Sequence, residues 1–145
     1  MADAKLILVV EDNPDDELLM LDALQHGGLK TEIAIARDGQ QALDFLFGAG
    51  DAPRDVENYP DLVLLDLKLP KIGGHEVLRR MRADRRTRHT PVVILTSSAE
   101  PSDIFQGYES GANSYVQKPV DFDEFLAAVK ALGVYWLDYN HIPAR

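Results

Sequence analysis

The feature that most constrains the fold of this chain is a regular alternation of short apolar runs with longer segments of helical spacing. Uninterrupted runs rich in Val, Ile and Leu cover residues 6–10, 62–65 and 92–95, and weaker runs cover 33–36 and 114–116. Runs this short and this continuous are typical of strands that are buried on both faces. Such strands need helices above and below them, so the pattern predicts a layered α/β domain.

The segments between these runs carry the signals of helices. The first begins with Asn13, a good N-cap, and Pro14, the favoured first helical residue, and we expect it to end at the glycine pair 27–28. Four more helices are predicted, over residues 40–47, 75–85, 102–110 and 123–138. A strand followed by a helix, five times over, predicts parallel strands joined by right-handed crossovers, with helices on both faces of the sheet.

Size and composition narrow the possible functions. The 145 residues suffice for one domain, with its core over about 5–132 and a helix extension and tail over 133–145. The net charge of −9 argues against nucleic acid or an anionic membrane as the main partner. The absence of cysteine excludes thiol catalysis and zinc–thiolate sites. The run at 6–10 is too short for an export signal or a membrane span, so we expect a cytoplasmic protein.

Chemically capable side chains stand where the predicted strands end. Glu11 and Asp12 follow the first strand, Asp66 the third and Lys118 the fifth, and Thr96 closes the fourth. Ligands of open parallel sheets bind beyond the carboxyl ends of the strands, where the strand order reverses. If the order is 2-1-3-4-5, Asp12 and Asp66 face each other across that point, with the hydroxyl and the ammonium on its far side.

Carboxylates gathered at one rim repel one another unless a cation neutralises them. Mg2+ suits oxygen ligands and commonly binds one or two carboxylates, waters and phosphate oxygens. Phosphoryl transfer needs such a cation together with donors around the transferred group. A carboxylate can also be the nucleophile and form an aspartyl phosphate, which Lys118 and Thr96 would then bind.

Together these motifs resemble the receiver domain of the response regulators of two-component signalling, over roughly residues 5–132. The similar features are the acidic pair, Asp66 before a Leu-Pro and a Gly-Gly turn, Thr96 followed by a small residue, and Lys118 before Pro119. The resemblance implies a flavodoxin-like, doubly wound α/β fold with a five-stranded parallel sheet in the order 2-1-3-4-5. It also implies a phosphoryl acceptor with slow self-hydrolysis, not an enzyme with turnover on an outside substrate.

The resemblance assigns these residues their roles. It makes Asp66 the phospho-acceptor, and it gives as ligands of Mg2+ or Mn2+ the residues Asp12, Asp66, Lys68 (backbone carbonyl) and, through water, Glu11. Its remaining assignments are Thr96 and Lys118 as phosphoryl-binding groups, Tyr115 as the aromatic switch, Pro119 as the site of a cis peptide bond, and Lys68 and Ser98 as residues that tune dephosphorylation.

Lys68 leaves two interpretations open. In the first, its ammonium lies over the phosphoryl group and hinders the attacking water, which prolongs the signal. In the second, Lys68 is a solvated lysine that contributes only its carbonyl.

Features outside the site resemble the small response regulators that partner bacterial and cyanobacterial phytochrome kinases. They are the extended loop 48–60, the sequence 68–71 and the ending at 135–137 with Pro143. The implied partner is a sensor histidine kinase, and this finer resemblance points to one of phytochrome type. No DNA-binding domain follows the predicted receiver, so we expect a stand-alone regulator whose output goes to an unidentified downstream protein.

A homodimer is the other expected assembly. Tyr135 and Tyr139, four residues apart, share one face at the end of the last predicted helix and suggest a subunit contact. Trp136 lies between them but continues the apolar stripe, so it can equally be part of the core.

Three other functions fit parts of the pattern. A flavodoxin-like electron carrier needs free backbone N–H groups for phosphate after the first strand, where the acidic loop 11–16 would repel it. An aspartyl-phosphate hydrolase has a second catalytic Asp two residues after the nucleophile, where this chain has Lys68. A receiver-like binding module that works without phosphorylation is the alternative that stays open.

Two further groups of side chains are interpreted as structural. The arginines between 79 and 88 have no interleaved aromatics and fit a solvated helix end better than a nucleic-acid site. The histidines at 26, 75, 89 and 141 show no ligand spacing, and we expect them to be exposed or partly buried.

Overall fold

The computed structural model describes residues 4–25, 30–50 and 58–143, and its centre is a five-stranded sheet. The strands are β1 (Lys5–Val10), β2 (Thr31–Ala36), β3 (Leu62–Leu65), β4 (Val92–Thr96) and β5 (Ser114–Gln117). All neighbouring strands pair in parallel, in the order β2-β1-β3-β4-β5. The predicted fold class and strand order are therefore confirmed.

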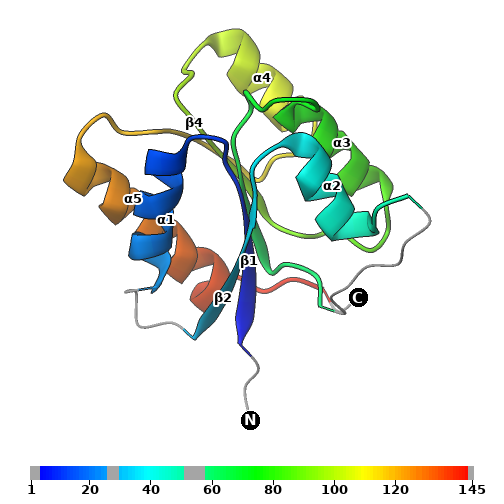
Figure 1. Ribbon diagram of the computed structural model, residues 1–145, viewed down its shortest axis with the longest axis horizontal. Helices are drawn as coiled ribbons and strands as arrows, with labels where there is room; N and C mark the ends of the chain where they lie inside the picture. The colour runs from blue at the N-terminus through cyan, green and yellow to red at the C-terminus, as the bar shows by residue number, and fades with distance from the viewer. Residues whose placement is uncertain (1–3, 26–29, 51–57, 144–145) are drawn as a thin grey trace.

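Helices cover both faces of the sheet. They are α1 (Pro14–Gln25), α2 (Gly39–Phe47), α3 (Gly74–Ala83), α4 (Pro101–Glu109) and α5 (Phe122–Val134), followed by a π-helical turn, η1 (Tyr135–Tyr139). Figure 1 shows α1 and α5 on one face, with α2, α3 and α4 on the other. No helix in the described ranges is long and apolar enough to span a membrane.

The side-chain alternation of the strands builds one core on each face of the sheet. Leu8 and Leu65 point to the core beneath α2 and α3, whereas Ile7 and Leu64 point to the core beneath α1 and α5. Successive residues of a strand face opposite sides, so an apolar run without interruption fills both cores. This double burial holds the strand ends in fixed positions at one rim.

The start of α1 follows the predicted capping chemistry. The side chain of Asn13 accepts hydrogen bonds from the N–H groups of Asp15 and Asp16, at 2.9 and 3.1 Å. Asp38 and Asp121 cap α2 and α5 in the same way. The predicted end of the first helix at 27–28, the histidine at 26 and the centre of the loop 48–60 lie outside the described residues.

The last predicted helix, 123–138, is in fact two elements. α5 ends at Val134 and the chain widens into η1, where the N–H of Asn140 donates to the carbonyl of Tyr135, five residues back. A π turn rotates the following side chains relative to an α-helix. In this turn Leu137 is buried, while Tyr135 and Tyr139 are exposed.

Candidate functional site

The carboxyl ends of β1 and β3 bring three carboxylates together. Glu11 and Asp12 follow β1 directly, and Asp66 follows β3, its N–H donating to the carbonyl of Val10 at 3.0 Å. Carboxylate oxygens of Glu11, Asp12 and Asp66 lie within 4.8 Å of one another. β1 and β3 are neighbours although α1, β2 and α2 separate them in sequence, so the reversal of strand order creates the cluster.

A buried ammonium lies beside this cluster. Lys118 follows β5, and its Nζ is 2.7 Å from Glu11, 2.8 Å from Asp16 and 3.0 Å from Asp66. Its side chain is only 8% exposed. The sequence predicted Lys118 as a partner of Asp66 and placed Asp16 in the acidic loop 11–16 near the same rim, but it did not predict a contact between Asp16 and Lys118.

Burial and the neighbouring charged groups shift the pKa values of Glu11 and Lys118. Burial raises the pKa of Glu11 to about 7, against the opposing effect of the Lys118 ammonium. Burial alone would lower the pKa of Lys118, but hydrogen bonds to Asp16 and Glu11 raise it above the usual lysine value. Lys118 therefore stays charged, and its single ammonium leaves part of the negative charge of the surrounding carboxylates unneutralised.

The acceptor loop after β3 is held closely by the start of α3. The N–H of Gly74 donates to the carbonyl of Leu67 at 2.9 Å. A methyl group on Gly74 would collide with the Asp66 carbonyl oxygen and lie 2.8 Å from the Leu67 Cα. Only glycine allows this approach, which fixes the backbone that presents Asp66.

On the far side of the site, β4 and β5 place the predicted switch residues. Thr96 closes β4 and is buried. The Tyr115 ring is half-buried, and its hydroxyl donates to the carbonyl of Ser98 at 2.9 Å. The Ser98 hydroxyl donates to Asp103 on α4 at 2.6 Å, so Ser98 and Tyr115 connect this loop to α4 and β5.

The predicted cis peptide bond at Pro119 is wrong in this structure. No peptide bond within the described ranges is cis, so Lys118 and Pro119 are joined by a trans bond. Trans is the more stable form of such bonds. The N–H of Lys118 donates to the carbonyl of Thr96 at 2.7 Å, which holds the lysine beside β4. From there its ammonium reaches the carboxylates without a cis bond.

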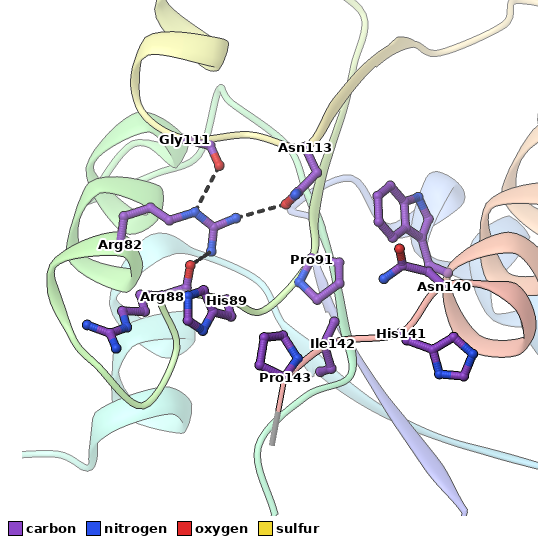
Figure 2. Close-up of a pocket in the computed structure, with 11 residues that line it drawn as sticks. Arg82, Arg88, His89, Pro91, Gly111, Asn113, Asn140, His141, Ile142 and Pro143 are labelled. Atoms are coloured by element: carbon purple, nitrogen blue, oxygen red, sulfur yellow. Dashed lines mark hydrogen bonds between the residues drawn. The ribbon is translucent and has the colours of Figure 1, made fainter. Parts of the chain in front are cut away.

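The arginine run is only partly a solvated helix end. Arg82 is half-buried, and Figure 2 shows its guanidinium directed at Gly111 and Asn113 beyond the end of α3. It donates to the Gly111 carbonyl at 2.8 Å, to the Thr90 carbonyl at 2.8 Å and to the Asn113 side chain at 2.9 Å. Arg82 thus joins the α3–β4 and α4–β5 loops, a structural role that its sequence position did not reveal.

The described histidines take no part in the acidic site. His75 is half-buried, both of its ring nitrogens are without a hydrogen-bond partner, and burial lowers its pKa. His89 and His141 are exposed and line the pocket beside Arg82. Among the described residues, the only group with the spacing of metal ligands is Glu11, Asp12 and Asp66.

Comparison with known proteins explains this arrangement. The sequence model of the response regulator receiver domain matches residues 7–130. The chain belongs to the response regulator receiver family. Receivers are signalling domains that bind a divalent metal at an acidic pocket, and the oxygen-only donor set of Glu11, Asp12 and Asp66 fits a hard cation.

Individual receivers are similar over nearly the whole chain. The probable methanogenesis regulatory protein FilR2 of Methanothrix harundinacea is 39% identical, over 97% of this chain and 89% of its own length. The phosphorylated cyanobacterial phytochrome response regulator RcpA is 34% identical, with a TM-score of 0.91 over 98% of this chain and 100% of its own. Mn2+-bound Rcp1, from Synechocystis, is 35% identical, with a TM-score of 0.85 over 97% and 99%.

Proposed function

We propose that this receiver accepts a phosphoryl group on Asp66 from a phosphohistidine of a sensor histidine kinase. The observation that carries the proposal is the buried Lys118 ammonium, 3.0 Å from the Asp66 carboxylate and beside the cluster that Asp66 forms with Glu11 and Asp12. A carboxylate flanked in this way is a nucleophile with a cation site on one side and a hydrogen-bond donor on the other.

The transfer exchanges one bond to phosphorus for another. An Asp66 oxygen attacks the phosphorus and a P–O bond forms while the P–N bond to histidine breaks. The electron pair of the broken bond returns to the imidazole nitrogen, which takes up a proton. Glu11, Asp12, Asp66 and the Lys68 carbonyl would hold Mg2+ or Mn2+, which when bound neutralises charge on the phosphoryl oxygens.

The added charge is the signal. A phosphoryl group brings about −1.5 to −2 charge to the rim. In this proposal Thr96 and Lys118 bind its oxygens, and the Tyr115 ring, whose hydroxyl donates to the Ser98 carbonyl, follows them. The equilibrium between the conformations of the surface made by α4, β5 and α5 then shifts. Exposed apolar side chains such as Phe105 and Phe122 lie on the helices of this surface.

Lys68 and Ser98 are proposed to set how long the phosphoryl group lasts. Lys68 is exposed and its N–H points to Asp66 at 3.4 Å, so its side chain can lie over the acceptor or remain in solvent. Ser98 is nearly buried and bound to Asp103, which makes it a fixed neighbour of the site rather than a mobile one.

We further propose a cytoplasmic regulator without turnover on an outside substrate, working as one receiver domain over 1–145. The likeness to RcpA and Rcp1 favours a kinase of phytochrome type, since RcpA is a phytochrome response regulator. Output then goes to a downstream protein rather than to nucleic acid or a membrane, in keeping with the net charge of −9.

A homodimer through the end of α5 is the proposed assembly. Tyr135 and Tyr139 are 52% and 70% exposed and line a groove of about 430 Å3 with Ala127 and Ala131. Trp136 packs partly on the core and meets the Tyr135 ring edge-on at 5.0 Å, so it supports the contact from behind.

Replacing both Tyr135 and Tyr139 with Glu is expected to turn a dimer at micromolar concentration into a monomer, because charge would enter an apolar contact. Sedimentation velocity measures the change, with Leu18→Glu, at an exposed apolar residue of α1, as the control that should leave the dimer intact. A wild-type protein that sediments as a monomer with and without phosphorylation would contradict the proposed dimer.

Phosphotransfer from a panel of sensor histidine kinases tests the proposed function. We expect rapid transfer of label from at least one kinase to the wild-type protein and none to Asp66→Asn, whose amide oxygen is a poor nucleophile. Label that persists in Asp66→Asn would overturn the assigned acceptor. A protein that takes no label from kinases or from small phosphodonors would favour the phosphorylation-independent binding module.

A further inference from the structure

Lys118 shares its ammonium with a carboxylate that stands outside the acidic cluster. Glu11 and Asp66 belong to the cluster at the ends of β1 and β3, whereas Asp16 comes from the first turn of α1. Asp16 is not among the three residues whose oxygens lie within 4.8 Å of one another, yet it is 2.8 Å from the Lys118 Nζ. Its contact with the site therefore runs through the lysine.

The geometry of Asp16 is set in advance by the start of α1. Its N–H donates to the Asn13 side chain at 3.1 Å, and its own side chain is only 24% exposed. An ammonium has three N–H donors, and here three carboxylates from three elements surround it. Asp16 thus occupies one of the three donors that would otherwise turn toward Glu11 and Asp66.

This sharing matters for a cation at the cluster. A divalent ion bound by Glu11 and Asp66 would lie close to the Lys118 ammonium, and the two positive charges would repel each other. The Asp16 carboxylate, 2.8 Å from the ammonium, partly neutralises its charge and competes with Glu11 and Asp66 for its three N–H donors. The loss of that carboxylate would strengthen both the repulsion and the competition for Glu11 and Asp66.

We propose that Asp16 is a positioning residue of the metal site, which holds the Lys118 ammonium so that Glu11 and Asp66 can bind Mg2+ with the lysine still in place. The inference rests on the proposed function, because it concerns the metal site that serves phosphorylation. It assigns a role to a contact between residues that are 102 positions apart.

Titration of the unphosphorylated protein with MgCl2, followed by the amide signals of the rim in NMR spectra, tests the proposal. Asp16→Asn is expected to weaken Mg2+ binding about fivefold, by the Coulomb energy of one lost charge near the site. Asp15→Asn is the matched control, because Asp15 is exposed, belongs to the same turn and makes no ion pair with Lys118. It should change the affinity by less than about twofold.

Two further variants separate positioning from simple charge. Asp16→Glu keeps the carboxylate within reach and should restore most of the affinity. In a Lys118→Met background there is no ammonium to hold, so the additional change Asp16→Asn should weaken Mg2+ binding less than it does in the wild-type protein.

Every outcome of these titrations supports or overturns the role proposed for Asp16. Equal weakening by Asp15→Asn and Asp16→Asn, an unchanged affinity in Asp16→Asn, or strictly additive effects with Lys118→Met would overturn the proposal. Suppose that wild-type protein binds Mg2+ and that Asp16→Asn weakens this binding. If Asp66 then takes no phosphoryl group, the inference stands and the proposed function fails. Normal phosphorylation with unchanged Mg2+ affinity in Asp16→Asn overturns the inference alone, and wild-type protein without Mg2+ binding overturns both.

Discussion

Replacing Lys118 with methionine is expected to reduce phosphoryl incorporation at Asp66 about a hundredfold, the usual effect of removing a fixed donor from developing charge. Methionine matches the length of the lysine stem but leaves Glu11, Asp16 and Asp66 without their common cation. Removing one partner of a buried ion pair costs about 3–5 kcal/mol of unfolding free energy. We expect the lower end, since Glu11, with its pKa of about 7, can take up a proton.

The loss of stability should depend on pH. Without the ammonium, ionised Glu11 repels its carboxylate neighbours, so the destabilisation by Lys118→Met is expected at pH 8. It should shrink as the pH falls toward 5.5, because Glu11, whose pKa is raised to about 7, then takes up a proton. Urea unfolding at the two pH values measures it. Lys71→Met is the control, because the Lys71 side chain is 68% exposed and its ammonium lies 3.6 Å from the Asp38 carboxylate. Equal stability of wild-type protein and Lys118→Met at pH 8 would refute the role given to the buried ammonium.

Adding one methyl group at Gly74 is expected to damage both the fold and the site. In Gly74→Ala the new Cβ meets the backbone of Asp66 and Leu67, which cannot move aside as a flexible side chain could. Such overpacking costs about 1–3 kcal/mol. Because the displaced backbone carries the acceptor, the rate of phosphorylation should fall along with the stability.

Gly73→Ala supplies the matched control for this prediction. A methyl group on Gly73 would lie 3.8 Å from its nearest neighbour, the Leu67 carbonyl, and Gly73 has an ordinary φ of −70°. Urea unfolding and labelling with a small phosphodonor compare the two variants. We expect Gly73→Ala to resemble wild-type protein, and equal behaviour of the two alanine variants would show that close packing at Gly74 does not position Asp66.

The sequence predicted the fold and the centre of the site because both depend on local patterns. The continuous apolar run at 6–10 requires burial on both faces, and the residues that follow such runs must lie at one rim, as Glu11 and Asp66 do. Thr96 could be expected at this rim because it closes a predicted strand, whereas the role given to Tyr115 came from the resemblance alone.

The details that the sequence could not supply depend on contacts across the fold. The Asp16–Lys118 pair joins the start of α1 to the end of β5, and nothing near either residue signals it. Arg82 looks like any basic residue at a helix end until the α4–β5 loop supplies its acceptors. The apolar stripe of the last helix hid the π turn at Tyr135, because a stripe marks the buried face and not the hydrogen-bond spacing.

The most direct test of the account is the mass of the intact protein after incubation with phosphoramidate and MgCl2, followed by peptide mapping. The account predicts a gain of one phosphoryl group, located on Asp66, that disappears when EDTA removes the metal and does not form in Asp66→Asn. A phosphoryl group found on another residue, or one that forms equally well without a divalent cation, would contradict it.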